Sequence, residues 1–138
     1  CQCSVPDADI IWAWNELLTG IPDVKKEALL ALRRSGHRLF LLSNTNFMHW
    51  EKCAADFFPY RDSEGHTYTA THFFEKIFLS CAMHLAKPDP AIFTEALRQA
   101  GIKAEDTLFI DDREDNCQAA QSVGITALHD PEGEIWFK

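Results

Sequence analysis

The segment TLFIDDREDN, residues 107–116, carries the pattern that decides the fold. An unbroken apolar run ends at two adjacent aspartates, and a helix-forming stretch follows from about Glu114 to Val123. Apolar runs of this length suit a strand that is covered on both faces. A buried strand that leads into a helix is the repeating unit of an α/β fold with a parallel sheet.

The same alternation of strand and helix continues on both sides of this segment. Strands are predicted at residues 38–43, 76–80, 107–110 and 125–128, and helices from Pro22 to Gly36 and over residues 47–57, 91–100 and 114–123. The polar residues 59–71 predict a surface loop. Asp89 and Pro90 are suited to begin a helix, and Gly101 to end it. The pattern predicts a three-layer, Rossmann-like fold with helices on both faces of a parallel sheet.

The N-terminal stretch is predicted to be helical. Ile11, Trp14 and Leu18 are spaced three and four residues apart, Asp7 can cap a helix that contains them, and Gly20 can end it.

Composition excludes several classes of protein. The chain has 138 residues, enough for one ordinary domain, and no apolar run approaches the ~20 residues of a membrane helix. Its formal charge of -8 argues against nucleic-acid binding. The five cysteines are scattered and odd in number, which favours reduced thiols and a cytoplasmic location. Because the chain does not begin with Met, we expect it to be a fragment or a processed product.

Three polar motifs follow predicted strands or precede a helix. Ser43 and Asn44 in LLSNTN are suited to phosphate oxygens, but a Ser-Asn pair is also an ordinary turn. Lys87 in AKPDP can pair with an anion, but a loop lysine is usually only solvated. Asp111 and Asp112 can hold Mg²⁺, although acidic residues before a helix also favour its dipole. All three motifs are predicted to meet at the sheet edge where α/β proteins bind ligands.

Taken together, LLSNTN, AKPDP and IDDREDN resemble motifs two, three and four of the haloacid dehalogenase-like (HAD) superfamily, in the group with a small helical cap. The resemblance covers about residues 10–129 and implies a Mg²⁺-dependent phosphatase of small phosphorylated metabolites. In that family an aspartate at the end of the first strand forms an aspartyl-phosphate. The resemblance implies that Ser43 and the Asn44 amide bind the phosphoryl group, that Lys87 neutralises its charge, that Asp112 coordinates Mg²⁺ and that Asp111 supports it.

One family motif is missing from the sequence. The first motif, D-x-D after an apolar strand, has no match, because only CQCSVP precedes Asp7 and Asp9. We therefore expect residues 1–20 to be a remnant of the helical cap and residues 21–138 to be a core without its central strand. An open slot would leave two rows of backbone groups unpaired. We therefore expect either that a segment of this or another chain fills it or that residues outside this sequence belong there.

Four readings of function remain open at this stage. The first is a phosphatase whose nucleophile lies outside this chain, and the second is a degenerate, non-catalytic binding module of the same fold. A haloacid dehalogenase is a third reading, to which the paired aspartates are less suited. In a signalling receiver domain the acidic pair precedes the lysine, which is the reverse of the order here.

Overall fold

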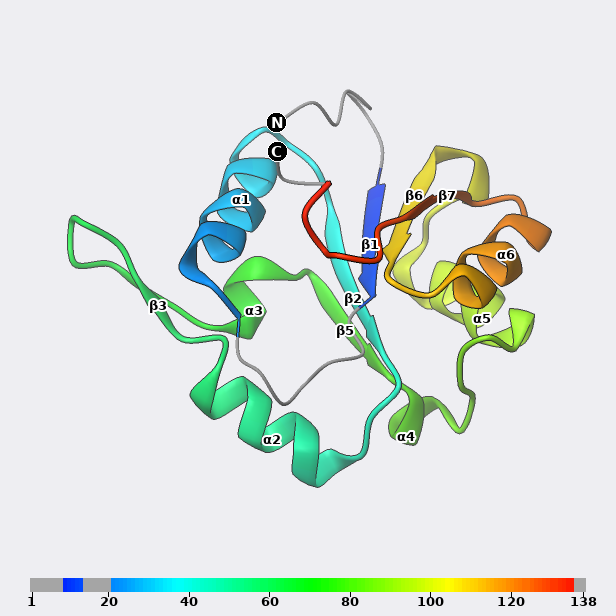
Figure 1. Cartoon of the computed structure of the whole chain (residues 1–138), viewed down its shortest axis with the longest axis horizontal. Coiled ribbons are helices and arrows are strands. Elements are labelled where there is room, and N and C mark those ends of the chain that lie inside the picture. The colour runs from blue at the N-terminus through cyan, green and yellow to red at the C-terminus, as the bar shows by residue number, and fades with distance from the viewer. Residues whose placement is uncertain (1–8, 14–20, 136–138) are drawn as a thin grey trace.

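The structure is a computed structural model that describes residues 9–13 and 21–135. Its centre is a sheet of five parallel strands in the order β5-β2-β1-β6-β7 (Figure 1). The strands are β1 (Asp9–Ala13), β2 (Leu39–Ser43), β5 (Lys76–Leu79), β6 (Thr107–Asp111) and β7 (Thr126–His129). All five carboxyl ends therefore lie at one edge. The predicted α/β fold with a parallel sheet is confirmed.

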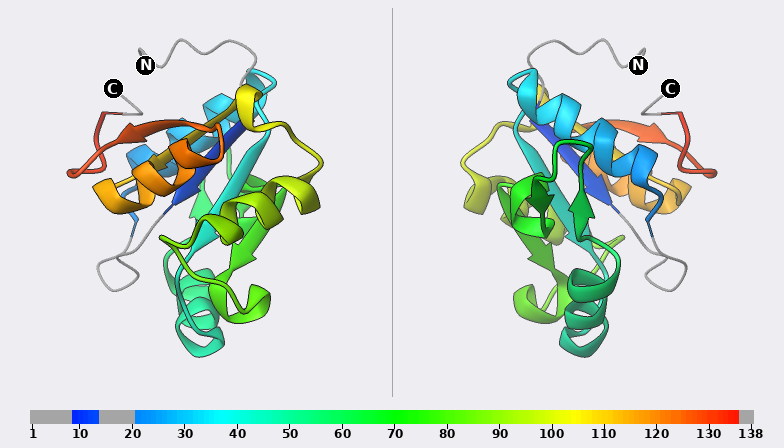
Figure 2. Two further views of the ribbon diagram at one scale, coloured as in Figure 1. Left: turned by 90° about the vertical axis from the view of Figure 1, so that its right-hand side faces the viewer. Right: turned by 90° about the vertical axis from the view of Figure 1, so that its left-hand side faces the viewer.

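Helices cover both faces of the sheet, as predicted (Figure 2). On one face lie α1 (Asp23–Arg34), α2 (Phe47–Asp56) and α3 (Ala70–Phe73), and on the other lie α5 (Pro90–Ala100) and α6 (Glu114–Ser122). Side chains alternate along each strand, because successive residues of a strand point to opposite faces. In β2, for example, Leu41 packs with the first group of helices, whereas Phe40 and Leu42 pack with the second.

The N-terminal prediction is wrong within the described residues. Asp9–Ala13 form the strand β1, not part of a helix, and β1 lies between β2 and β6. Pairing on both sides satisfies the two rows of backbone groups that an empty central position would expose. The central position was expected to be filled by a segment of this or another chain, and residues 9–13 of this chain fill it. Asp7 and residues 14–20 lie outside the described residues. For them, the assignment to a remnant of the helical cap that ends at residue 20 stays a prediction.

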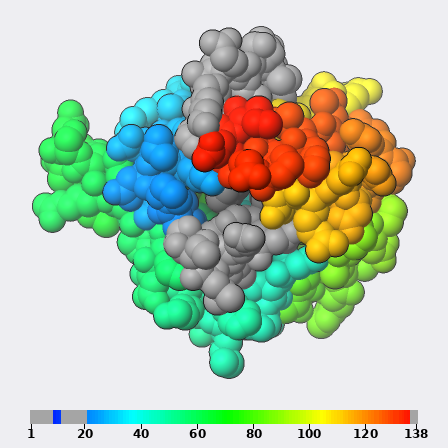
Figure 3. Space-filling model, in the orientation of Figure 1, coloured from blue at the N-terminus to red at the C-terminus, as the bar shows by residue number. Residues whose placement is uncertain are grey.

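In α1, Leu29 and Leu30 are the buried apolar residues, whereas Val24 is exposed. One smaller difference from the sequence prediction concerns the polar loop. The predicted loop over residues 59–71 contains a short hairpin of β3 (Tyr60–Arg61) and β4 (Thr67–Tyr68). This hairpin projects from the body of the molecule (Figure 3).

The remaining elements follow the sequence signals closely. Asp89 caps α5 by accepting a hydrogen bond from the Ala91 amide, and Gly101 ends the helix with a left-handed φ of 68°. The short helices α4 (Ser80–Met83) and η1 (Ala104–Asp106) complete the described part. None of the helices in this part has the length and apolar character needed to cross a membrane.

Candidate functional site

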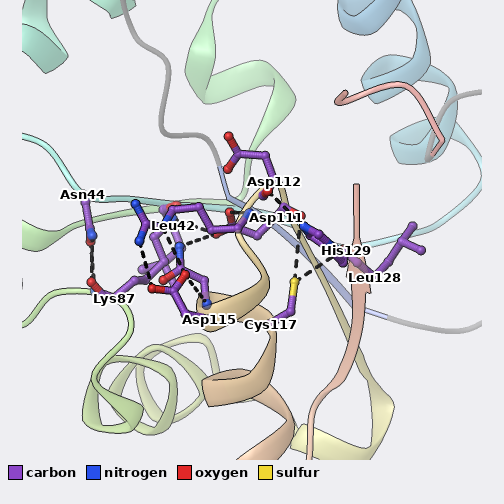
Figure 4. Close-up of polar contacts among 11 residues, drawn as sticks. Leu42, Asn44, Lys87, Asp111, Asp112, Asp115, Cys117, Leu128 and His129 are labelled. Atoms are coloured by element: carbon purple, nitrogen blue, oxygen red, sulfur yellow. Dashed lines mark hydrogen bonds and ion pairs between the residues drawn. The ribbon is translucent and has the colours of Figure 1, made fainter. Parts of the chain in front are cut away.

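The predicted site residues gather at the carboxyl edge of the sheet. Ser43 is the last residue of β2 and Asp111 the last of β6, and Asn44 and Asp112 follow them directly. Lys87 comes from the loop between α4 and α5 and contacts the ends of both strands (Figure 4). Parallel strands place their carboxyl ends together, so the motifs converge although they are far apart in sequence.

The Lys87 ammonium is the centre of this cluster. Its Nζ atom donates to the Leu42 carbonyl at 3.3 Å and to Asp111 Oδ2 at 3.1 Å. Both side chains of the ion pair are fully buried. Burial lowers the pKa of Lys87, while the nearby Asp111 carboxylate opposes that shift. Because β1 lies between β2 and β6, the ammonium lies at the carboxyl end of the central strand.

Both carboxylate oxygens of Asp111 accept hydrogen bonds from the protein. Oδ2 accepts from Lys87 and from Asn116 Nδ2, the latter at 2.9 Å, and Oδ1 accepts from the Arg113 amide at 2.9 Å. The residue is only 1% exposed. Asp111 therefore fixes the lysine, and its capacity to bind a further ligand directly is small.

Asp112 has a different environment, although it is the next residue. It is half-buried, and desolvation together with the adjacent Asp111 raises its pKa from 3.8 to about 6. The His129 ring at the end of β7 donates from Nε2 to the Asp112 carbonyl at 3.1 Å. A carboxylate that is costly to charge at neutral pH is one that a nearby cation would stabilise.

Ser43 and Asn44 lie beside the lysine but are used differently. Ser43 is buried at the end of β2, between Leu42, which accepts from the Lys87 ammonium, and Asn44. The Asn44 side chain hydrogen-bonds the main chain of Lys87. The family resemblance implies that the Asn44 backbone amide binds phosphate, and the sequence gives no signal of this side-chain contact.

Two residues of this cluster were not among the predicted site residues. Asn116, the last residue of the IDDREDN motif, holds Asp111 through its side-chain amide. The signal for it is its position in the first turn of α6, which begins directly beyond the end of β6. His129 is exposed and lies opposite Asp111 in the β6–β7 register, which the sequence does not reveal.

The D-x-D spacing of Asp7 and Asp9 does not supply the missing motif within the described residues. Asp9 begins β1 and pairs with Thr107, the first residue of β6, so it lies at the edge of the sheet opposite Lys87. The carboxyl end of β1 carries Ala13. Asp7 lies outside the described residues.

The residues present fit a magnesium ion. Asp112 offers a carboxylate beside the acidic Asp111, and oxygen ligands of this kind suit Mg²⁺. Among the described residues Asn116 Oδ1 is buried without a hydrogen-bond partner, and Asn116 lines a cavity of about 320 Å³ together with Asn44, Lys87, Pro88 and Arg113. A buried amide oxygen of this kind is satisfied by a donor such as an ordered water molecule.

Replacing Asp112 with Asn should raise the stability of the protein at neutral pH. The folded-state pKa is raised, so the folded chain binds more protons than the unfolded chain between about pH 4 and pH 6. The free energy of unfolding therefore falls as the pH rises through this window. We expect Asp112→Asn to increase it by on the order of 1 kcal/mol at pH 8, a value discounted for solvent screening. Urea unfolding at pH 8 and pH 4 measures the effect, and a gain of equal size at pH 4 would contradict its electrostatic cause.

The sequence matches the family model of the haloacid dehalogenase-like hydrolases over residues 5–124. The chain is 30% identical over 126 residues to a D-ribitol-5-phosphate phosphatase from Bacteroides thetaiotaomicron, which covers 90% of this chain and 57% of the relative. It is 29% identical to a sesquiterpene phosphatase from Aspergillus oryzae, over 93% of this chain and 61% of the relative. The chain thus spans about three fifths of the length of these relatives.

A solved structure supports the same relationship. A wild-type HAD family enzyme from Bacteroides thetaiotaomicron, in complex with magnesium and inorganic phosphate, matches with a TM-score of 0.78 and 42% identity. The match covers 86% of this chain and 57% of the other.

Proposed function

The chain belongs to the haloacid dehalogenase-like hydrolase family, and we propose that it provides the phosphoryl-binding part of a Mg²⁺-dependent phosphatase of small phosphorylated metabolites. The observation that carries the proposal is the buried Lys87 ammonium. It joins the ends of β2 and β6 beside Ser43 and Asp111. A fixed positive charge at this edge is suited to the oxygens of a phosphate.

Each residue of the cluster has a distinct part in the proposal. Ser43 and the Asn44 amide hold phosphoryl oxygens, Lys87 balances their charge, and Asp112 holds Mg²⁺ with support from Asp111. When bound, the ion supplies further positive charge toward the phosphate. A HAD family enzyme similar to this chain was solved in complex with magnesium and inorganic phosphate, which supports the choice of these two ligands.

In this proposal the attacking carboxylate belongs to a part of the protein outside this chain. The named relatives act on a sugar-alcohol phosphate and on a sesquiterpene, according to their names. Because these substrates differ greatly, we propose only the class of small phosphorylated molecules. The phosphate-binding edge, which does not depend on the organic part of the substrate, is the part that this chain contributes.

A second candidate is a non-catalytic binding module of the same fold. The observation that favours it is the sequence of β1, which has Ala13 at its carboxyl end and Asp9 at its amino end. Such a module would bind phosphate through the same residues without cleaving an ester.

The 138-residue chain should not hydrolyse phosphate esters above background, because in this proposal the nucleophile needed for a covalent intermediate lies outside it. Release of p-nitrophenolate from p-nitrophenyl phosphate in the presence of Mg²⁺ measures this. In a longer protein that includes the first family motif, activity should appear and should be abolished by Asp112→Ala. Activity of the 138-residue chain that disappears in Asp112→Ala would contradict this prediction. An inactive longer protein would favour the binding module.

A further inference from the structure

We infer that the Asn44 side chain is a positioning residue, which holds the main chain of Lys87 and thereby sets the place of its ammonium at the carboxyl end of β1. The inference rests on the proposed function, because it explains how this chain fixes the group proposed to balance phosphate charge. The Asn44 side chain therefore has a role of its own, in addition to the phosphate-binding role that the family resemblance implies for the Asn44 backbone amide.

The contact uses both polar atoms of one side-chain amide. Asn44 Nδ2 donates to the Lys87 carbonyl at 3.0 Å, and Asn44 Oδ1 accepts from the Lys87 amide at 2.9 Å (Figure 4). The side chain thus makes the reciprocal pair of hydrogen bonds that two opposed residues exchange in an antiparallel ladder. It joins two segments that are 43 residues apart in sequence.

This contact determines where the lysine side chain begins. Lysine has a flexible stem with several rotatable bonds, so its ammonium is fixed only when both ends of the side chain are held. Leu42 and Asp111 hold the ammonium end, and Asn44 holds the main-chain end. Because Asn44 directly follows Ser43, one turn of the chain places both the hydroxyl and the lysine at the same edge.

The geometry also predicts which substitutions the site tolerates. Aspartate has the size of asparagine and keeps an acceptor for the Lys87 amide. It places its second oxygen against the Lys87 carbonyl, however, and two acceptors repel. Asn46, in the same turn, is a matched control because its Oδ1 caps α2 by accepting from the His49 amide. Aspartate fulfils that capping role as well as asparagine does.

The test compares Asn44→Asp with Asn46→Asp in the 138-residue chain. The reactivity of each lysine toward an amine-acylating reagent is followed by mass spectrometry, since the side chain of Lys87 is fully buried. Loss of a hydrogen-bonded contact of about 1.5–3 kcal/mol should raise the acylation rate of Lys87 by roughly 10- to 100-fold in Asn44→Asp. We expect no change in Asn46→Asp. Lys26, also buried and bonded to the Pro59 carbonyl, reports global unfolding in the same sample.

Several outcomes are decisive. An unchanged Lys87 rate in Asn44→Asp overturns the inference, and so does an increase shared by Lys26 or by Asn46→Asp. If Asn44→Asp does not fold, Asn44→Ala removes both hydrogen bonds without adding charge and must give the same contrast between Lys87 and Lys26. Titration with inorganic phosphate separates the inference from the proposed function. Faster acylation with unchanged phosphate affinity would support the positioning role of Asn44 and contradict the phosphate role of Lys87.

Discussion

Replacing Lys87 with Met is expected to lower the free energy of unfolding by about 3–5 kcal/mol, because it leaves a buried carboxylate without its counterion. Asp111 is 1% exposed, and among the described residues the Arg113 amide and the Asn116 side chain still donate to its carboxylate. Neither carries a positive charge at the donor atom. The loss is a large part of the about 5–15 kcal/mol that stabilises an ordinary domain. Urea unfolding followed by far-ultraviolet circular dichroism measures it.

A matched control is available on the surface. Lys52 forms an ion pair with Asp56 at 2.9 Å, but both side chains are at least half exposed. The same substitution at Lys52 should therefore change stability by less than about 1 kcal/mol. Equal losses of unfolding free energy in Lys87→Met and Lys52→Met would show that burial does not determine how much the Lys87–Asp111 ion pair contributes to stability.

The double variant Lys87→Met/Asp111→Asn separates stability from ligand binding. Neutral groups replace both charges, so much of the lost stability should return, whereas the proposed affinity for inorganic phosphate should not. Recovery of phosphate binding in the double variant would remove the lysine from the proposed site.

The parts of the fold that could be predicted are those in which local and global signals agree. The run from Thr107 to Ile110 is apolar enough to be buried on both faces, and it forms β6, which pairs with β1 and β7. Asp89, Pro90 and Gly101 mark α5 through chemistry that acts within a few residues. Such signals are independent of the rest of the chain.

The central strand could not be predicted in this way. Ile10 and Ile11 suit a strand or a buried helix equally, because a short apolar run has no decisive period. What determines β1 is pairing with β2 and β6, which follow it in sequence by about 30 and 100 residues. The central position was expected to be filled, but the helical spacing of Ile11, Trp14 and Leu18 concealed which segment fills it.

The site was predicted to the level of which residues meet, not of how they bind. Ser43, Lys87 and Asp111 converge because parallel strands end at one edge. The difference between Asp111 and Asp112 depends on which side chain turns inward, and the Asn44 contact depends on a loop 43 residues away. These features arise from tertiary packing, and no local pattern encodes them.

The second large effect concerns the central strand itself. Ile11 is fully buried and pairs with Phe40 on β2 and with Phe109 on β6, in the core shared with α5 and α6. Ile11→Ala should lower the free energy of unfolding by about 2–5 kcal/mol through lost burial and the cavity that remains. Denaturant unfolding of the 138-residue chain measures this loss.

Ile135→Ala is the matched control, because the same atoms are removed from a side chain that is 56% exposed. Its effect should stay within about 0.5 kcal/mol, as is usual for surface positions. The comparison tests where residues 9–13 lie in the fold, because the control removes any change in stability that an Ile→Ala substitution would cause at a surface position. If this segment lay outside the sheet, Ile11 would be as dispensable as Ile135, and equal effects would contradict its place between β2 and β6. A large loss at Ile11 alone would also mean that the central slot in solution is filled by a strand whose carboxyl end offers Ala13 where the family's nucleophile is expected.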